Sequence, residues 1–157
     1  MKTIKRRRLE AKTDYRSRLA LLKSGKSRVV VRKTNRYIIG QLVSSDTAQD
    51  SVLLTLSSRD LLEKGWPKEN SGSLKSLPAA YLAGKLFASK AIKLAKEGIL
   101  DLGMYRNVSR SRLYAFVKGA IDGGLKIPCS SEVLPQEKDF KRNSKLNSVF
   151  EKLNKSI

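Results

Sequence analysis

The chain has 157 residues, of which 40% are hydrophobic, and its 33 lysines and arginines outnumber its 14 acidic residues to give a formal net charge of +19. This length and apolar content are sufficient for one domain with a real core, which argues against a fully disordered chain. A charge excess of this size is typical of a protein whose partner is a polyanion. We therefore expect one globular domain with basic extensions.

Compartment signals in the sequence agree with one another. Cys129 is the only cysteine and histidine is absent, so an intramolecular disulfide and a zinc site of the usual Cys/His type are both excluded. The sequence contains no apolar run of about 18 residues and no apolar signal-peptide region behind its charged start. We expect a cytoplasmic protein with no membrane partner.

The positive charge is concentrated in residues 1–36, which hold 14 of the 33 basic side chains and two of the acidic ones. Residues 1–8 have too little apolar surface to fold alone, so we predict that they are disordered until a partner binds. Residues 9–23 have helical periodicity, which predicts a helix that buries a narrow apolar stripe and shows a basic face. The stripe consists of Tyr15, Leu19 and Leu22.

Residues 28–34, 37–44 and 51–57 are rich in β-branched and apolar side chains, which predicts three strands in an antiparallel meander. A polar turn separates the first two strands, and the basic residues Arg32, Lys33 and Arg36 cluster around it. The predicted hairpin therefore extends the basic surface that the N-terminal segment begins.

The second half of the chain predicts further helices and one more strand. In chain order we expect a short helix at 58–64, a polar loop at 67–76, a long helix at 78–98, a short strand at 99–104, an amphipathic helix from a Ser109 cap to Gly123, and a proline-containing tail with a short helix. This order indicates an α/β fold in which helices flank a mixed sheet, the meander plus a further strand. We divide the chain into a basic N-terminal arm and helix (1–25), an α/β core domain (26–126) and a C-terminal extension (127–157).

Catalysis is not supported by the residues present. Without histidine the commonest general base is missing, and the Gly25-Lys26-Ser27 stretch lacks the upstream glycine of a nucleotide-binding phosphate loop. Asp101, in a predicted apolar strand, and Asp122, at a helix end, are the candidate buried acids, although pairing with a cation or with backbone is the commoner role for such carboxylates. We predict a protein that is not an enzyme and needs no cofactor or metal.

Nucleic-acid binding fits the residues better, because aromatic side chains recur beside the basic ones, as stacking on unpaired bases requires. Tyr105 precedes three arginines around a predicted helix N-terminus, where a phosphate could bind; these are Arg106, Arg110 and Arg112. Tyr15 and Tyr37 also neighbour basic residues. Trp66, on a Gly-Trp-Pro loop, has two interpretations: a lid over the sheet edge, or a contact to RNA or protein.

Five segments in order resemble one protein family over roughly residues 5–135. They are "RRRLEAKTDYRSRLALLKSGKSRVVVRKTNRYIIGQLV", "GW", "PAAYLAGKLFASKA", "ILDLG" and "SRLYAFVKGAIDGGLKIP". Together they resemble the archaeal form of universal large-subunit ribosomal protein eighteen, the 5S rRNA-binding family. The resemblance implies an RNase H-like α/β sandwich without nuclease activity, which attaches 5S rRNA to large-subunit rRNA in the central protuberance beside a neighbouring 5S-binding ribosomal protein.

Carried onto matching positions, the resemblance implies RNA contacts from the arm and from the hairpin. The arm contacts would be Arg6, Arg7, Arg8, Lys12, Thr13, Tyr15, Arg16 and Arg18, and the hairpin contacts would be Arg32, Lys33, Asn35 and Arg36. Our full candidate set adds Lys5, Arg28, Tyr37, Trp66, Tyr105, Arg106, Arg110 and Arg112.

Two other functions share parts of this pattern. A histone-like, architectural binder of duplex DNA would have the same charge, but it would not need a mixed sheet with a basic hairpin and scattered aromatics. A nuclease on the same fold would need several acidic residues that converge on the sheet to hold metal ions, and the sequence offers only Asp101 in a predicted core strand. Preference for RNA tests the first alternative, and divalent-dependent cleavage tests the second.

Overall fold

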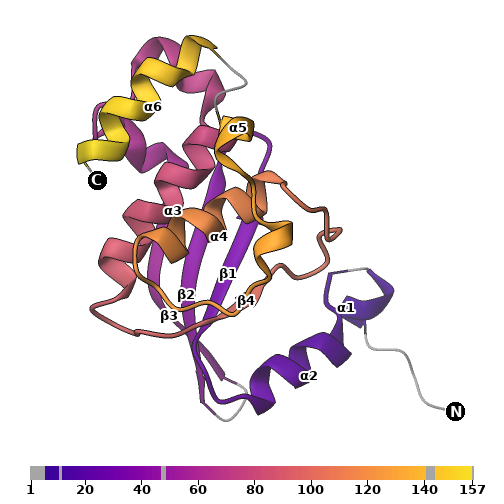
Figure 1. Cartoon of the computed structure of the whole chain (residues 1–157). Helices are drawn as coiled ribbons and strands as arrows, with labels where there is room; N and C mark the ends of the chain where they lie inside the picture. The colour runs from indigo at the N-terminus through magenta and orange to yellow at the C-terminus, as the bar shows by residue number, and fades with distance from the viewer. Residues whose placement is uncertain (1–5, 11, 47–48, 141–143, 157) are drawn as a thin grey trace, which may run out of the picture.

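The computed structural model of the chain describes residues 6–10, 12–46, 49–140 and 144–156. Within them lies a four-stranded sheet of strand order β3-β2-β1-β4 (Figure 1). β1 (Arg28–Lys33), β2 (Ile38–Asp46) and β3 (Gln49–Ser57) form the antiparallel meander, and β4 (Ile99–Asp101) pairs in parallel with β1. The predicted mixed sheet, a three-strand meander plus one further strand, is therefore confirmed.

One face of the sheet is covered by α3 (Leu77–Ala91) and α4 (Arg112–Asp122), as Figure 1 shows. Two helices of the C-terminal segment, α5 (Glu137–Phe140) and α6 (Ser144–Ser156), contact α3 in turn. Three short 3-10 turns complete the body: η1 (Ser58–Leu62), η2 (Lys68–Ser73) and η3 (Ser131–Val133). The α/β class predicted from the order of elements is correct.

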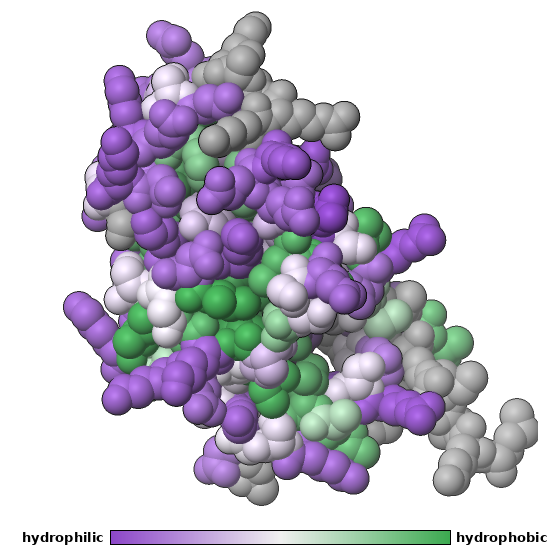
Figure 2. Space-filling view, viewed as in Figure 1, coloured by the Kyte–Doolittle hydropathy of each residue, from purple (hydrophilic) through white to green (hydrophobic). Residues whose placement is uncertain are grey.

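The N-terminal segment lies apart from this helical layer. α1 (Arg6–Leu9) and α2 (Tyr15–Lys23) extend from the end of the sheet at which β1 begins (Figure 1). Seen from the same side in Figure 2, hydrophilic side chains cover the area over α5 and α6, and hydrophobic ones gather across the middle of the face. None of the helices in the described ranges has the length and apolar character of a transmembrane span.

The core depends on a very close crossing of α3 and α4. A Cβ added at Gly84 would lie 2.0 Å from the Phe116 carbonyl oxygen, and one at Gly119 would lie 2.0 Å from the Tyr81 carbonyl oxygen. Only glycine allows the two backbones to approach this closely. The approach presses the fully buried Phe116 ring onto the sheet, where a Cβ at Gly40 would lie 2.2 Å from Cζ of the ring.

The arm differs from the sequence prediction in where its helices begin. The continuous helix expected from residue 9 instead begins at Tyr15, because the Asp14 carboxylate caps it by accepting hydrogen bonds from the Arg16 and Ser17 N–H groups at 3.0 and 3.3 Å. Disorder was expected up to residue 8, yet residues 6–9 form the single turn of α1. The part of that prediction on residues 1–5 lies outside the described residues.

The apolar stripe predicted for α2 is not buried. None of the α2 residues is buried, and Leu19 is 55% exposed. Helical spacing shows that a stripe exists but not that another element covers it, and the layer of α3 and α4 lies on the sheet instead. The prediction of a buried stripe was therefore wrong.

Two other helix boundaries also differ from the predictions. α3 ends at Ala91 rather than near Gly98, and a turn leads from Ile92 to β4. α4 begins behind Ser111 rather than Ser109, because Arg110 takes a left-handed conformation (φ 55°) that breaks the helix before that point.

Replacing Gly119 by alanine tests the helix crossing. The new methyl group would meet the α3 backbone, which cannot move as a flexible side chain would, so we expect the free energy of unfolding to fall by at least about 2 kcal/mol. Urea denaturation of the full chain measures this change. Gly72→Ala is the matched control, because a Cβ there has no atom within 4 Å; equal losses in both variants would contradict the close crossing.

Candidate nucleic-acid interface

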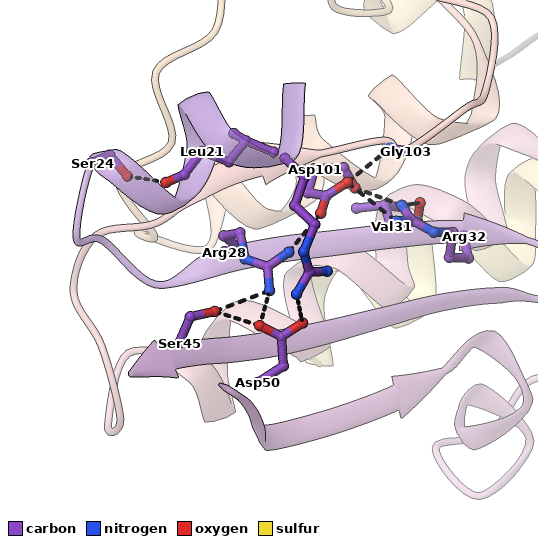
Figure 3. Close-up of polar contacts among 10 residues, drawn as sticks. Leu21, Ser24, Arg28, Val31, Arg32, Ser45, Asp50, Asp101 and Gly103 are labelled. Carbon is purple, nitrogen blue, oxygen red and sulfur yellow. Dashed lines mark hydrogen bonds and ion pairs between the residues drawn. The ribbon is translucent and has the colours of Figure 1, made fainter. Parts of the chain in front are cut away.

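A buried arginine organises the face of the sheet opposite α3 and α4. Val29 and Val31 point into the core, so alternation along β1 sends Arg28 to the other face. Arg28 is only 3% exposed. Its Nη1 donates to Asp101 Oδ2 at 3.0 Å, and its Nη2 donates to Asp50 Oδ1 at 2.6 Å (Figure 3). One guanidinium thus joins β1, β4 and β3.

Asp101 holds the loop that follows β4. Its Oδ1 accepts hydrogen bonds from the Gly103 N–H at 2.8 Å and from Arg32 Nη2 at 3.2 Å, and its backbone carbonyl accepts one from Arg32 Nη1 at 2.7 Å (Figure 3). Both carboxylate oxygens are therefore engaged by cations, as the commoner role for a buried acid predicts. Among the described residues, no group of three or more histidine, cysteine or acidic side chains could hold a metal ion.

Asp50 connects the arm to the sheet. Its Oδ2 pairs with Arg18 Nη2 of α2 at 2.8 Å, while Oδ1 accepts hydrogen bonds from Arg28 and from Ser45 Oγ, the latter at 2.6 Å. Burial by itself would raise the pKa of Asp50, but the hydrogen bonds from Ser45, Arg28 and Arg18 outweigh it and lower the pKa to about 2. The carboxylate is thus charged throughout the neutral range and fixes one side of α2.

Two residues of the predicted RNA-binding set are buried in the protein. Arg28 is buried between Asp50 and Asp101, so its charge is neutralised inside the protein. Trp66 is 2% exposed, and its Nε1 donates to the Asn70 carbonyl at 3.0 Å. Of the two interpretations of Trp66, its burial in the core favours the lid over a contact to RNA or protein.

Some cations of the arm form ion pairs within the protein, and others do not. Arg6 and Lys12 both pair with Glu10 at 2.7 Å. Arg16 is exposed on α2, and within the described ranges its guanidinium forms no ion pair or hydrogen bond. Thr13 and Tyr15 are half-buried. Arg16 is thus available to an external anion.

The β1–β2 turn is held rigidly enough to present its cations in fixed positions. Thr34 and Tyr37 close the turn with a backbone hydrogen bond of 2.8 Å, and the Tyr37 N–H donates to Thr34 Oγ1 at 2.9 Å. Lys75 Nζ donates to the Asn35 carbonyl at 2.8 Å. Sequence reasoning missed Lys75, because nothing in the local pattern links it to a turn 40 residues earlier. Lys33 and Arg36 remain exposed beside this turn.

The loop between β4 and α4 joins the arm to the hairpin. Gly103 and Met104 line a hollow together with Lys12 and Arg32. Further along, the Tyr105 hydroxyl donates to the Lys33 backbone carbonyl. Since β4 runs parallel to β1, the loop leaves the sheet at the end where the hairpin turn lies. The three basic segments therefore form one surface.

A second hollow, of about 430 Å³, lies where this loop enters α4. Lys33 of the hairpin meets the loop cations there, together with the ring of Tyr105; the cations are Arg106, Arg110 and Arg112. The Arg110 N–H donates to the Val133 carbonyl at 2.8 Å, which fixes the loop just before the helix. The structure thus brings the predicted cluster of Tyr105 and the three arginines together at the N-terminus of α4, and Lys33 lies beside it.

Most of the predicted contact residues share this surface. Lys12, Thr13, Arg18 and Arg32 line the hollow beside the arm, and Lys33, Tyr105, Arg106, Arg110 and Arg112 line the one beside α4. Arg16, Asn35, Arg36 and Tyr37 lie on α2 and at the hairpin turn, and the side chains of Lys5, Arg7 and Arg8 lie outside the described part.

The structure thus has a helix-backed mixed sheet, cations gathered on one continuous surface, and a central acid, Asp101, that is paired with two arginines, a combination that suits a nucleic-acid-binding scaffold. Residues 1–98 match the family described as ribosomal large subunit proteins 60S L5, and 50S L18.

Two archaeal relatives show the same family. Large ribosomal subunit protein uL18 of Korarchaeum cryptofilum (strain OPF8) is 49% identical over 149 residues, which cover 94% of this chain and 74% of the relative. Large ribosomal subunit protein uL18 of Methanoculleus marisnigri (strain ATCC 35101 / DSM 1498 / JR1) is 47% identical over 137 residues, 87% of this chain and 76% of that protein. The chain belongs to this ribosomal protein family.

Family membership settles the general role. The chain is a structural constituent of the large subunit of a cytoplasmic ribosome, and it is not an enzyme. As a member of this family it binds rRNA and takes part in translation. The resemblance inferred from the five sequence segments is thereby confirmed.

Removing the Asp101 carboxylate tests the buried network. In Asp101→Ala, Arg28 keeps Asp50 but loses its partner on β4, so we expect the free energy of unfolding to fall by about 3 kcal/mol. Glu97→Ala is the control, because Glu97 and Lys26 form an exposed pair at 3.1 Å whose loss should change little. Similar urea midpoints for both variants would show that Arg28 does not depend on Asp101.

Acid titration tests the role of Asp50. Because the folded-state pKa of Asp50, about 2, lies below the ordinary value of 3.8 that it has in the unfolded chain, its stabilisation of the folded protein is complete above about pH 4 and is lost as the pH falls toward 2. Melting temperatures of the wild type and Asp50→Asn, measured from pH 6 to pH 2, should differ most at pH 6 and converge at the acid end. Parallel curves would contradict this linkage.

Proposed function

We propose that the chain binds 5S ribosomal RNA and attaches it to large-subunit rRNA in the central protuberance, beside a neighbouring 5S-binding ribosomal protein. The observation that carries this proposal is the continuous cationic surface, which runs from α2 over the loop after β4 to the β1–β2 turn. We place it on an RNase H-like sandwich, whose layer of α3 and α4 leaves this surface accessible.

The division of charge on the protein supports a phosphate-rich partner. Arg28 and Arg32 are neutralised by Asp50 and Asp101, whereas Arg16, Lys33 and Arg36 form no ion pair within the described residues. Unpaired cations on a protein of net charge +19 repel one another, and binding to phosphates relieves this repulsion while it releases counterions.

The shape and composition of the surface favour folded RNA over a straight duplex. Three separately anchored segments present the cations, and tyrosines lie among them where unpaired bases could stack. In this proposal, the arm (1–25) and the core (26–126) supply the 5S rRNA contacts, and the extension (127–157) packs on α3 as a support. Large-subunit rRNA and the neighbouring protein would then bind on surfaces that remain exposed around them.

A competition titration tests the proposal directly. The full chain is bound to labelled 5S rRNA and challenged with tRNA and with duplex DNA over a salt series. Affinity from phosphate contacts alone falls steeply with salt on every polyanion. We expect 5S rRNA to remain bound at salt concentrations that release the two competitors. Equal loss on all three would identify a general polyanion binder and favour the architectural alternative.

Charge reversal at Arg16 tests the arm. Arg16→Glu removes one cation and adds a repulsive charge, so we expect the Kd for 5S rRNA to rise at least about tenfold and the salt slope to fall by about 1. Lys152→Glu is the matched control, because Lys152 is also exposed but lies on α6, away from the cationic surface. Equal losses from both variants would show that the arm is not the site.

A further inference from the structure

The hollow beside α4 combines two kinds of lining that a simple phosphate groove does not need. Its volume of about 430 Å³ is in the range of sites that hold a small molecule. One part of its wall is apolar, formed by Leu77, Val108 and Leu113, and the remainder carries cations. A groove that only follows a phosphate backbone needs the cations alone.

Tyr105 is fixed between these two parts. Its hydroxyl donates to the Lys33 backbone carbonyl, so the polar end of the side chain is already hydrogen-bonded to the protein. The residue is nevertheless 37% exposed and lines the hollow. An aromatic ring held in this way loses little conformational freedom when a second planar ring stacks on it.

The cations around the hollow are not neutralised by the protein. In the described ranges, the charged groups of Lys33, Arg106, Arg110 and Arg112 form no ion pair or hydrogen bond, in contrast to those of Arg28 and Arg32. Gathering four such charges around an apolar wall is unfavourable until an anion binds. The ligand should therefore be anionic at one end and flat and apolar at the other.

We propose that this hollow binds a single unstacked nucleotide of the RNA, with its base against Tyr105 and the apolar wall and its phosphates on the surrounding cations. The inference rests on the proposed function and adds a ligand class, an extruded and unpaired nucleotide instead of a stretch of duplex backbone. Stacking of a base on an aromatic ring beside phosphate contacts is the general chemistry by which proteins bind unpaired bases.

NMR titration of the ¹⁵N-labelled full chain tests the hollow without any RNA. The probes are adenosine monophosphate, adenosine and inorganic phosphate. We expect adenosine monophosphate to give saturable shifts at residues 103–113 and at Lys33, with an affinity several-fold higher than that of adenosine or phosphate alone. If inorganic phosphate bound as tightly as adenosine monophosphate, the hollow would be only a cluster of cations and the proposal would be wrong. Shifts that fail to saturate would also overturn it.

Variants at the hollow separate stacking from charge. Tyr105→Ala should lower the affinity for the mononucleotide and for 5S rRNA about tenfold each, while the salt dependence of RNA binding stays unchanged. Arg106→Gln should instead lower that slope by about 1. Tyr105→Phe keeps the ring and loses the bond to Lys33, so it should retain most of the affinity. Leu94→Ala is the control, because Leu94 is 52% exposed but lines neither this hollow nor the one beside the arm.

The two proposals fail in different ways. If Tyr105→Ala binds 5S rRNA as tightly as the wild type while the wild type still prefers 5S rRNA to tRNA, the hollow proposal is wrong and the 5S proposal stands. If the wild type shows no preference for 5S rRNA, the 5S proposal fails, and the mononucleotide titration still decides the hollow.

Discussion

The Arg28 guanidinium, buried between Asp101 and Asp50, is the interaction on which the arm, the sheet and the loop after β4 depend. A charge removed from water is tolerated only when it is paired and hydrogen-bonded, so both carboxylates must stay in place. Asp101 then fixes the loop through Gly103, and Asp50 fixes α2 through Arg18. One buried charge thus sets the position of the two segments that carry much of the cationic surface.

The face of the sheet covered by α3 and α4 is stabilised by close packing. There the backbones of α3 and α4 approach closely at Gly84 and Gly119, and dispersion attraction and the exclusion of water stabilise the contact. The α4 helix contributes Phe116 to the core at one side and begins at the hollow beside Tyr105 at the other. The packing of α4 against α3 and the sheet therefore determines where the cations of the loop before α4 lie.

Sequence reasoning succeeded where a property belongs to a single segment. The β-branched runs predicted the strands, and the amphipathic pattern that ends at Gly123 predicted α4. It failed where the outcome depends on a distant partner. Arg28 is buried by Asp50 and Asp101, 22 and 73 residues away, and Leu19 stays exposed because no element in the described part of the chain covers it. The meeting of Lys33 with the loop follows from the parallel pairing of β4 with β1, which periodicity does not reveal.

Ultraviolet cross-linking of the full chain to 5S rRNA, read out by mass spectrometry, tests most directly whether the three basic segments form the rRNA interface. The account predicts cross-links on α2, at the β1–β2 turn and in the loop of residues 102–111, with Tyr105 prominent among them. Cross-links concentrated on α6 or on the exposed side of α3, with these three segments unmodified, would contradict it.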